Sequence, residues 1–139
     1  MTVHLDHLMI PCEDKEAAAK RLAGILGVFY GPAKIGPFTA VHVNEGLTID
    51  FDEWTSEFPK GHYCFRVTEI EFKEVLARLV ALGVPYRSLP HGAVDHEVNL
   101  SLGSPIVYWS QPDGHVWELL VESYARATTQ PFGPAQGAA

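Results

Sequence analysis

The sequence has few cysteines, few basic residues and no long apolar segment, and each scarcity argues against a class of protein. Cys12 and Cys64 are its two cysteines, too few for a disulfide framework. Lys and Arg total 10 against 17 Asp and Glu, a net charge of −7, so we expect no nucleic acid and no anionic membrane as partner. No apolar run approaches the ~18 residues of a membrane span, and the N-terminal residues lack the charged-then-apolar pattern expected of a leader. We therefore expect a soluble cytoplasmic protein.

The sequence contains enough apolar residues to form a core, and its predicted elements repeat. Its 139 residues are 47% apolar, which suits one structural domain. Periodicity and turn signals predict two series of elements. The first series is a strand (3–10), a helix (15–26) and strands (38–43, 47–51); the second is a strand (62–67), a helix (71–82) and strands (84–89, 106–110, 116–122).

The two series match each other in detail. His7 precedes Gly27 by 20 residues, and His62 precedes Gly83 by 21. Each glycine follows a helix and lies in a Leu-Gly-Val triplet. The chain therefore reads as two copies of strand, helix and three strands, an α+β fold of paired βαβββ modules. We place the modules at 1–57 and 61–124 and a C-terminal tail at 125–139.

Glu118 is the residue that most needs an explanation. In a strand that follows the Pro-Asp-Gly turn, side chains alternate, so Glu118 shares a face with Val116 and Leu120 while Trp117 and His115 occupy the other. Burying an unpaired carboxylate costs several kcal/mol, so Glu118 requires a partner.

The repeat supplies candidates for that partner. His7 and His62 occupy matching first strands, and Asp50 and Glu118 occupy matching last strands. If the modules are related by an approximate twofold axis, these side chains converge into a site for Fe(II), Mn, Ni or Zn. The alternatives are that the histidines are hydrogen-bonded structural residues and that Glu118 forms a salt bridge with Arg66 or Lys60.

Three motifs resemble those of the vicinal oxygen chelate superfamily, which includes glyoxalase I, fosfomycin-resistance thiol transferases, extradiol dioxygenases and bleomycin-binding proteins. They are Asp-His-Leu (6–8), Gly-His-aromatic (61–63) and Pro-Asp-Gly-His-x-x-Glu-Leu (112–119). The resemblance covers about residues 2–124 and implies sheets that curl around a cupped site. It implies that His7, His62 and Glu118 bind a divalent metal, with Asp50 as a possible fourth ligand.

The resemblance also implies chemistry and further site residues. The ion would chelate two adjacent oxygens of a small-molecule substrate or intermediate, and the protein would be a homodimer. Tyr108, on the strand beside Glu118, could donate a hydrogen bond to substrate, and His96 could act in the same reaction. We expect substrate contacts from Arg66, Asn99 and Trp54.

A different class of function is a non-catalytic protein that sequesters a large cationic antibiotic, as bleomycin binders do. The acidic charge would attract the drug, and Trp54, Tyr63, Trp109 and Trp117 would line its groove. Such a binder needs no metal, so an intact set of His7, His62 and Glu118 favours an enzyme. A retained fold without activity is a third hypothesis.

Overall fold

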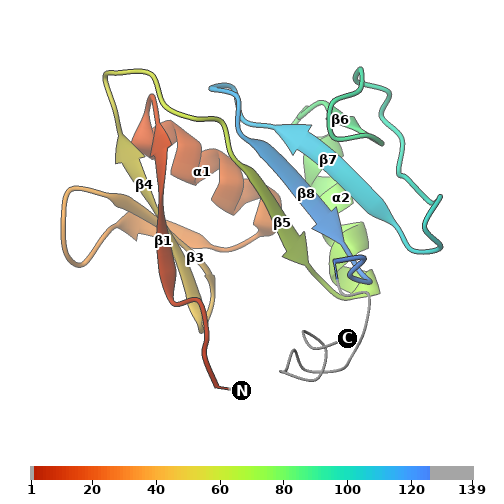
Figure 1. The fold of residues 1–139 in the computed structure, drawn as a ribbon, viewed down its shortest axis with the longest axis horizontal. Coiled ribbons are helices and arrows are strands. Elements are labelled where there is room, and N and C mark those ends of the chain that lie inside the picture. Colours follow the sequence, from red (N-terminus) through yellow and green to blue (C-terminus); the bar gives the residue numbers. More distant parts are fainter. Residues whose placement is uncertain (1, 126–139) are drawn as a thin grey trace, which may run out of the picture.

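A computed structural model describes residues 2–125 and contains two four-stranded mixed sheets, each with one helix (Figure 1). The α+β class and the twofold βαβββ repeat are thus confirmed. The first module consists of β1 (His7–Cys12), α1 (Lys15–Leu26), β2 (Phe29–Pro32), β3 (Thr39–Asn44) and β4 (Leu47–Glu53), in sheet order β1-β4-β3-β2. The second consists of β5 (His62–Arg66), α2 (Glu69–Ala81), β6 (Tyr86–Arg87), β7 (Ile106–Ser110) and β8 (Val116–Leu120), in order β5-β8-β7-β6.

The helix ends follow from capping residues. Asp14 accepts a hydrogen bond from the Ala17 amide at 3.0 Å, and Gly27 ends α1 in the left-handed region at φ 73°. Thr68 and Glu71 form a reciprocal capping box, so α2 begins at Glu69, two residues before the predicted start. The bounds of α1 are as predicted.

Three strands differ most from the prediction. β1 runs from His7 to Cys12 instead of over 3–10, because its parallel partner β4 extends to Glu53. Pro11 is tolerated in β1 because this strand is at the sheet edge, where one side needs no hydrogen bond. β2 was not predicted, because its last two residues, Gly31 and Pro32, are a turn signal, and it too is an edge strand. β6 spans only Tyr86–Arg87.

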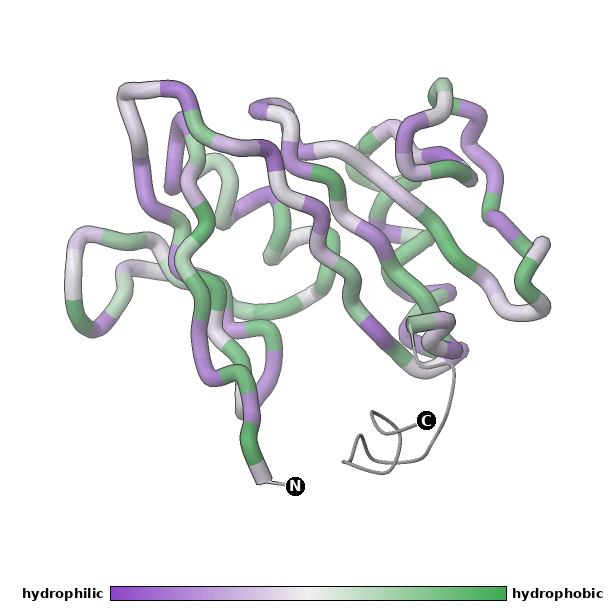
Figure 2. The backbone as a smooth tube through the Cα atoms, viewed as in Figure 1, coloured by the Kyte–Doolittle hydropathy of each residue, from purple (hydrophilic) through white to green (hydrophobic). Residues whose placement is uncertain are grey.

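The two helices lie on the same side of the sheets, and a shared core forms beneath them (Figure 1). Phe51 of β4 and Trp117 of β8 contact edge to face with ring centroids 6.4 Å apart, which joins the modules. Figure 2 shows that hydrophobic residues are concentrated along strands and helices, with some in the long connection from β6 to β7. Within the described residues, no helix is both long and apolar enough to cross a bilayer.

His115 is a polar link inside this core. Its side chain is fully buried; Nδ1 accepts from the Gly61 amide at 2.8 Å, and Nε2 donates to the Pro11 carbonyl at 2.7 Å. Because Pro11 belongs to β1 and Gly61 precedes β5, one buried imidazole satisfies partly buried backbone groups of both modules.

We expect His115→Leu to lower the free energy of unfolding by about 2 to 4 kcal/mol, because it leaves a partly buried amide and a partly buried carbonyl unpaired. Urea denaturation followed by tryptophan fluorescence measures the change. The control His91→Leu alters an exposed loop residue and should change stability by less than about 0.5 kcal/mol. Equal midpoints for the two variants would contradict a linking role for His115.

Candidate functional site

The open face of the second sheet, opposite α2, carries the Glu118 carboxylate. Strand pairing places Cys64 of β5 and Tyr108 of β7 on either side of Glu118 in β8. Glu118 has no exposed surface, and its face alternates with that of Trp117 as predicted. A fully buried carboxylate therefore lies in the middle of a row of three side chains.

Two side chains donate hydrogen bonds to this carboxylate. Nε2 of His62 lies 2.7 Å from Oε1, and because a carboxylate only accepts, Nε2 donates. The Tyr124 hydroxyl lies 2.8 Å from Oε1 and 2.6 Å from Oε2. The salt bridge to Arg66 or Lys60, one of the alternatives from the sequence, is not formed: Arg66 donates to the Val121 carbonyl, and Lys60 lies over the Phe58 ring.

His7 and Asp50 lie on the open face of the other sheet. Together with Met9, Phe38 and His42 they line a hollow of about 490 Å³. The His7 side chain is 61% exposed, and its Nδ1 is 2.8 Å from the Asp6 carboxylate. That hydrogen bond raises the pKa of His7. His7 is thus a solvent-accessible imidazole at the mouth of an open hollow.

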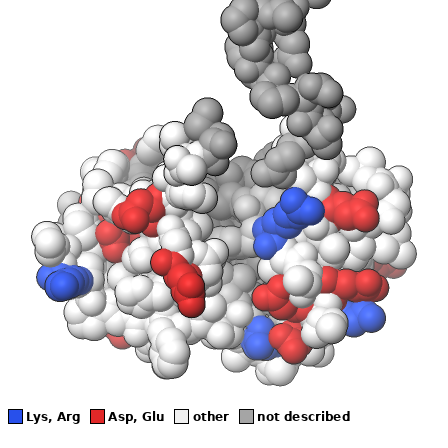
Figure 3. Space-filling view, turned by 90° about the horizontal axis from the view of Figure 1, so that it is seen from below, with Lys and Arg blue, Asp and Glu red and all other residues white. Residues whose placement is uncertain are grey.

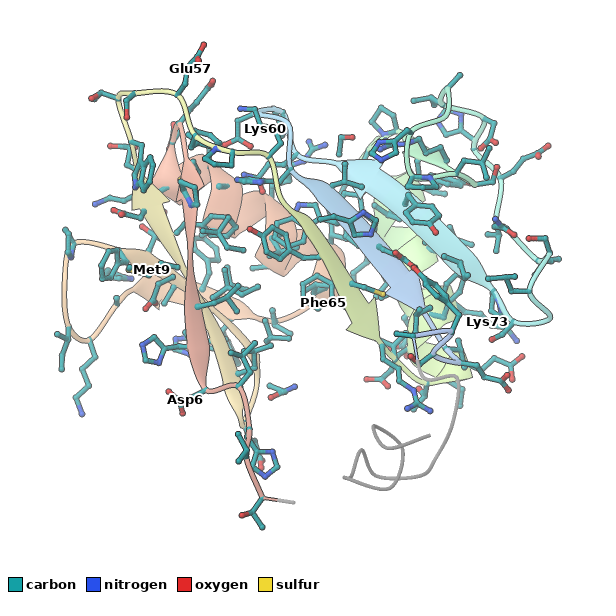
Figure 4. The ribbon with its side chains drawn as sticks, in the orientation of Figure 1. Asp6, Met9, Glu57, Lys60, Phe65 and Lys73 are labelled. Carbon is teal, nitrogen blue, oxygen red and sulfur yellow. The ribbon has the colours of Figure 1, made fainter. Side chains whose placement is uncertain are left out.

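A single chain does not bring His7 to the pair of His62 and Glu118. Among residues 2–125, no three His, Cys, Asp or Glu side chains are arranged to hold one ion. Figure 4 shows the separation: β1, marked by Asp6 and Met9, and β5, marked by Phe65, belong to different sheets. The structure thus unites two of the three predicted ligands and leaves the third on the other module.

The loop between β6 and β7 holds two of the other predicted residues in its own hydrogen bonds. The Asn99 amide donates to Ser88 and accepts from Ser101. The His96 backbone has φ 53° and its amide donates to Tyr86, whose ring lies 5.1 Å from the imidazole. The contacts of both residues therefore organise the loop.

Trp54 has a different setting, at the end of β4. Its indole N–H donates to Asp52 at 2.8 Å, and its ring meets Phe58 edge to face. Trp54 and Lys60 both border a hollow of about 360 Å³. Of the other predicted substrate-contact residues, Arg66 lines a separate hollow of about 410 Å³ beside Cys64.

Two site features were missed in the sequence. Tyr124 was assigned only as the last residue before the tail, because a residue beyond the end of a strand carries no periodic signal. Cys64 was set aside with the cysteine count, although it shares the parity of His62 on β5. Residues 126–139, most of the predicted tail, lie outside the described residues.

The carboxylate affects the acidity of its neighbours. Burial and then the charge of Glu118 raise the pKa of Tyr108. The hydrogen bond to Glu118 raises the pKa of Tyr124, so both phenols keep their protons at neutral pH. Desolvation, followed by the charge of Glu118, raises the pKa of Cys64 from 9.0 to about 12. The site thus presents protonated donors around one anion.

Cys64 should therefore react slowly although its residue is exposed. A rise in the thiol pKa from 9.0 to about 12 lowers the thiolate fraction at pH 8 by roughly a thousandfold. We expect iodoacetamide to modify native Cys64 correspondingly slowly at pH 8, and Glu118→Gln to accelerate the reaction. Mass spectrometry of the alkylated peptide measures both rates. Alkylation of the native protein at the rate of the urea-unfolded chain would contradict this.

No family model matches the chain, and no curated protein matches it. Several solved structures do. A protein described as oxidase ChaP-H2 has 32% identity and a TM-score of 0.81, covering 92% of this chain and all (100%) of its own. Oxidase ChaP-H1 has 34% identity and a TM-score of 0.80, with coverages of 90% and 100%. The fosfomycin resistance protein FosX from Listeria monocytogenes has 19% identity and a TM-score of 0.66, with coverages of 90% and 98%, and shows the shared fold.

Proposed function

Because this chain belongs to the vicinal oxygen chelate superfamily, we propose that it is a divalent-metal-dependent enzyme acting on an oxygen-rich small molecule. The observation that carries the proposal is the fully buried carboxylate of Glu118, which touches an imidazole and lies on an open sheet face. A core carboxylate with no Lys or Arg partner within the described chain is unfavourable for folding alone, and a cation offsets its desolvation.

The donor set suits such an ion. Two imidazoles and one carboxylate, from His7, His62 and Glu118, match Fe, Mn, Ni or Zn and leave positions open for substrate. Asp50 lines the same hollow as His7 and is the candidate fourth ligand. The His62 nitrogen that donates to Glu118 would have to give up that hydrogen bond to become a ligand, with the ring proton carried on Nδ1 instead.

We propose that the site is completed across a homodimer. His7 is exposed on the open face of the first sheet, while His62 and Glu118 lie on the open face of the second. Docking the first module of one copy on the second module of another would cover both faces and supply the third ligand. Each dimer would then hold two equivalent sites.

The chain's own residues have distinct roles in this proposal. A bound divalent ion would act as a Lewis acid on two adjacent substrate oxygens. Tyr108 lies beside Glu118 on the neighbouring strand and keeps its proton at neutral pH, so it can donate a hydrogen bond to a substrate oxygen. His62 packs edge to face on the Tyr108 ring with centroids 6.1 Å apart, which orients both side chains.

We further propose that the reaction is an oxidation that uses O₂ as the electron acceptor. Support comes from the two relatives above 30% identity, whose descriptions are oxidases. Sequestration of a cationic drug has less support, because Trp109 and Trp117 are core residues at 0% and 1% exposure and cannot line a groove. On the face drawn in Figure 3, basic side chains lie among the acidic ones.

The test is elemental analysis of untagged protein that has never met a chelator. Near-stoichiometric Fe, Mn, Ni or Zn that is lost in His62→Ala would support the metal site. An oxygen electrode with catechols and polyphenols as substrates then tests the oxidation. Metal-free protein that binds a cationic glycopeptide would instead favour sequestration, and turnover without O₂ consumption would exclude the oxidase assignment.

A further inference from the structure

The hydroxyl of Tyr124 lies against both oxygens of Glu118, on the side from which an ion bound by both oxygens would approach. It lies 2.8 Å from Oε1 and 2.6 Å from Oε2, so it faces both oxygens at once. Metal ions of the proposed class bind carboxylate oxygens at about 2.0–2.2 Å. An ion on the same side of this carboxylate would therefore overlap the phenol oxygen, and the two cannot be bound there together.

The segment that carries Tyr124 combines an anchoring hydrogen bond at its start with an exposed side chain at its end. β8 ends at Leu120, and the chain turns back over the following residues so that Tyr124 returns to Glu118. Arg66 anchors the start of this turn by donating to the Val121 carbonyl at 3.1 Å. Tyr124 itself is 51% exposed, so its ring has little core packing to lose when it leaves.

Tyr124 also provides hydrogen bonding to the buried Glu118 carboxylate when no ion is bound. His62 satisfies only Oε1, whereas the Tyr124 hydroxyl reaches both oxygens. The hydroxyl contacts Oε2 at 2.6 Å, so removing it would weaken the hydrogen bonding of this buried oxygen. The same contact that stabilises the carboxylate thus competes with a cation for it.

From this geometry we propose that Tyr124 is a place-holder for the metal: it caps Glu118 until an ion binds and is displaced, with the turn of residues 121–125, when the ion enters. The inference rests on the proposed metal site. In this proposal the turn of residues 121–125 controls access of the ion to Glu118, and Tyr124 lowers the metal affinity of the site. The displaced phenol is then free to contact substrate at the rim of the site.

The test is a titration of chelator-treated full-length protein with Co(II), followed by calorimetry and by the visible absorption of the ion. Tyr124→Phe, which removes only the hydroxyl, should bind Co(II) about tenfold more tightly than the unmodified chain. Tyr124→Ala should shift the affinity in the same direction, which guards against obstruction by the remaining ring. Tyr30→Phe, a partly exposed tyrosine of β2 in the other sheet, is the matched control and should leave affinity unchanged.

Hydrogen–deuterium exchange gives a second readout that is independent of activity. Amides of residues 121–125 should exchange faster when Co(II) is added to the unmodified chain, because the turn is released. If Tyr124→Phe binds Co(II) equally or more weakly while His62→Ala still abolishes binding, the place-holder is overturned and the metal site stands. If no chain binds Co(II), the metal site itself falls, and the place-holder falls with it.

Discussion

Replacing Glu118 with leucine is expected to abolish metal binding without weakening the fold. Leucine fills similar volume between Val116 and Leu120 and removes a charge that is fully buried. Replacing buried ionic groups with apolar side chains is often neutral or stabilising by about 1 to 4 kcal/mol. The partners that lose a hydrogen bond, His62 and Tyr124, are 41% and 51% exposed, so water can satisfy them.

The same substitution removes the carboxylate of the three principal proposed ligands, and metal affinity should fall by more than about a hundredfold. Elemental analysis gives the metal content, and urea denaturation of chelator-treated protein gives the stability. Glu122→Leu, two residues beyond the end of β8 at an exposed position, is the matched control and should keep its metal. An outcome in which Glu118→Leu unfolds but Glu118→Gln remains folded and metal-loaded would show that Glu118 serves packing alone.

A stable, metal-free Glu118→Leu variant would have a clear meaning. Residues selected for folding lose stability when they are replaced, whereas a residue kept for chemistry can be replaced with a gain. Glu118 is the charged residue on an otherwise apolar face of β8, and it is also the proposed metal ligand.

The sequence predicted those parts of the structure that local chemistry determines. Capping residues gave the bounds of α1, and alternation placed Glu118 on the opposite face from Trp117. The repeat predicted that the side chains of His62 and Glu118 converge, and they are in contact at 2.7 Å. Each of these depends on residues within one element or on two adjacent strands.

The sequence did not predict features that depend on how distant segments dock. The position of β1 follows from the length of β4, which pairs with it from about 40 residues away. The relative placement of the modules depends on contacts such as Phe51 with Trp117 and His115 with Pro11. Because these contacts put His7 on a separate sheet face, equivalent positions in the repeat do not meet within one chain.

Mixing two individually defective chains should restore metal binding if the site is shared between subunits. In a His7→Ala homodimer both sites lack one imidazole, and in a His62→Ala homodimer both lack the other. A heterodimer of the two variants contains one doubly defective site and one intact site, in which His7 comes from the His62→Ala chain and His62 from its partner. Random exchange should therefore restore metal to about a quarter of all sites.

The measurement is metal content after the two purified variants are co-refolded, compared with each variant refolded alone. The His7 side chain is 61% exposed and its replacement should not affect folding, which circular dichroism of each variant verifies. A mixture of the single variant His7→Ala with the double variant His7→Ala/His62→Ala is the matched control and should bind no metal, because it contains no His7. If the first mixture also stays metal-free although heterodimers form, the ligands are not shared across the interface. If His7→Ala alone retains its metal, His7 is not a ligand, and the ion relies on the second module.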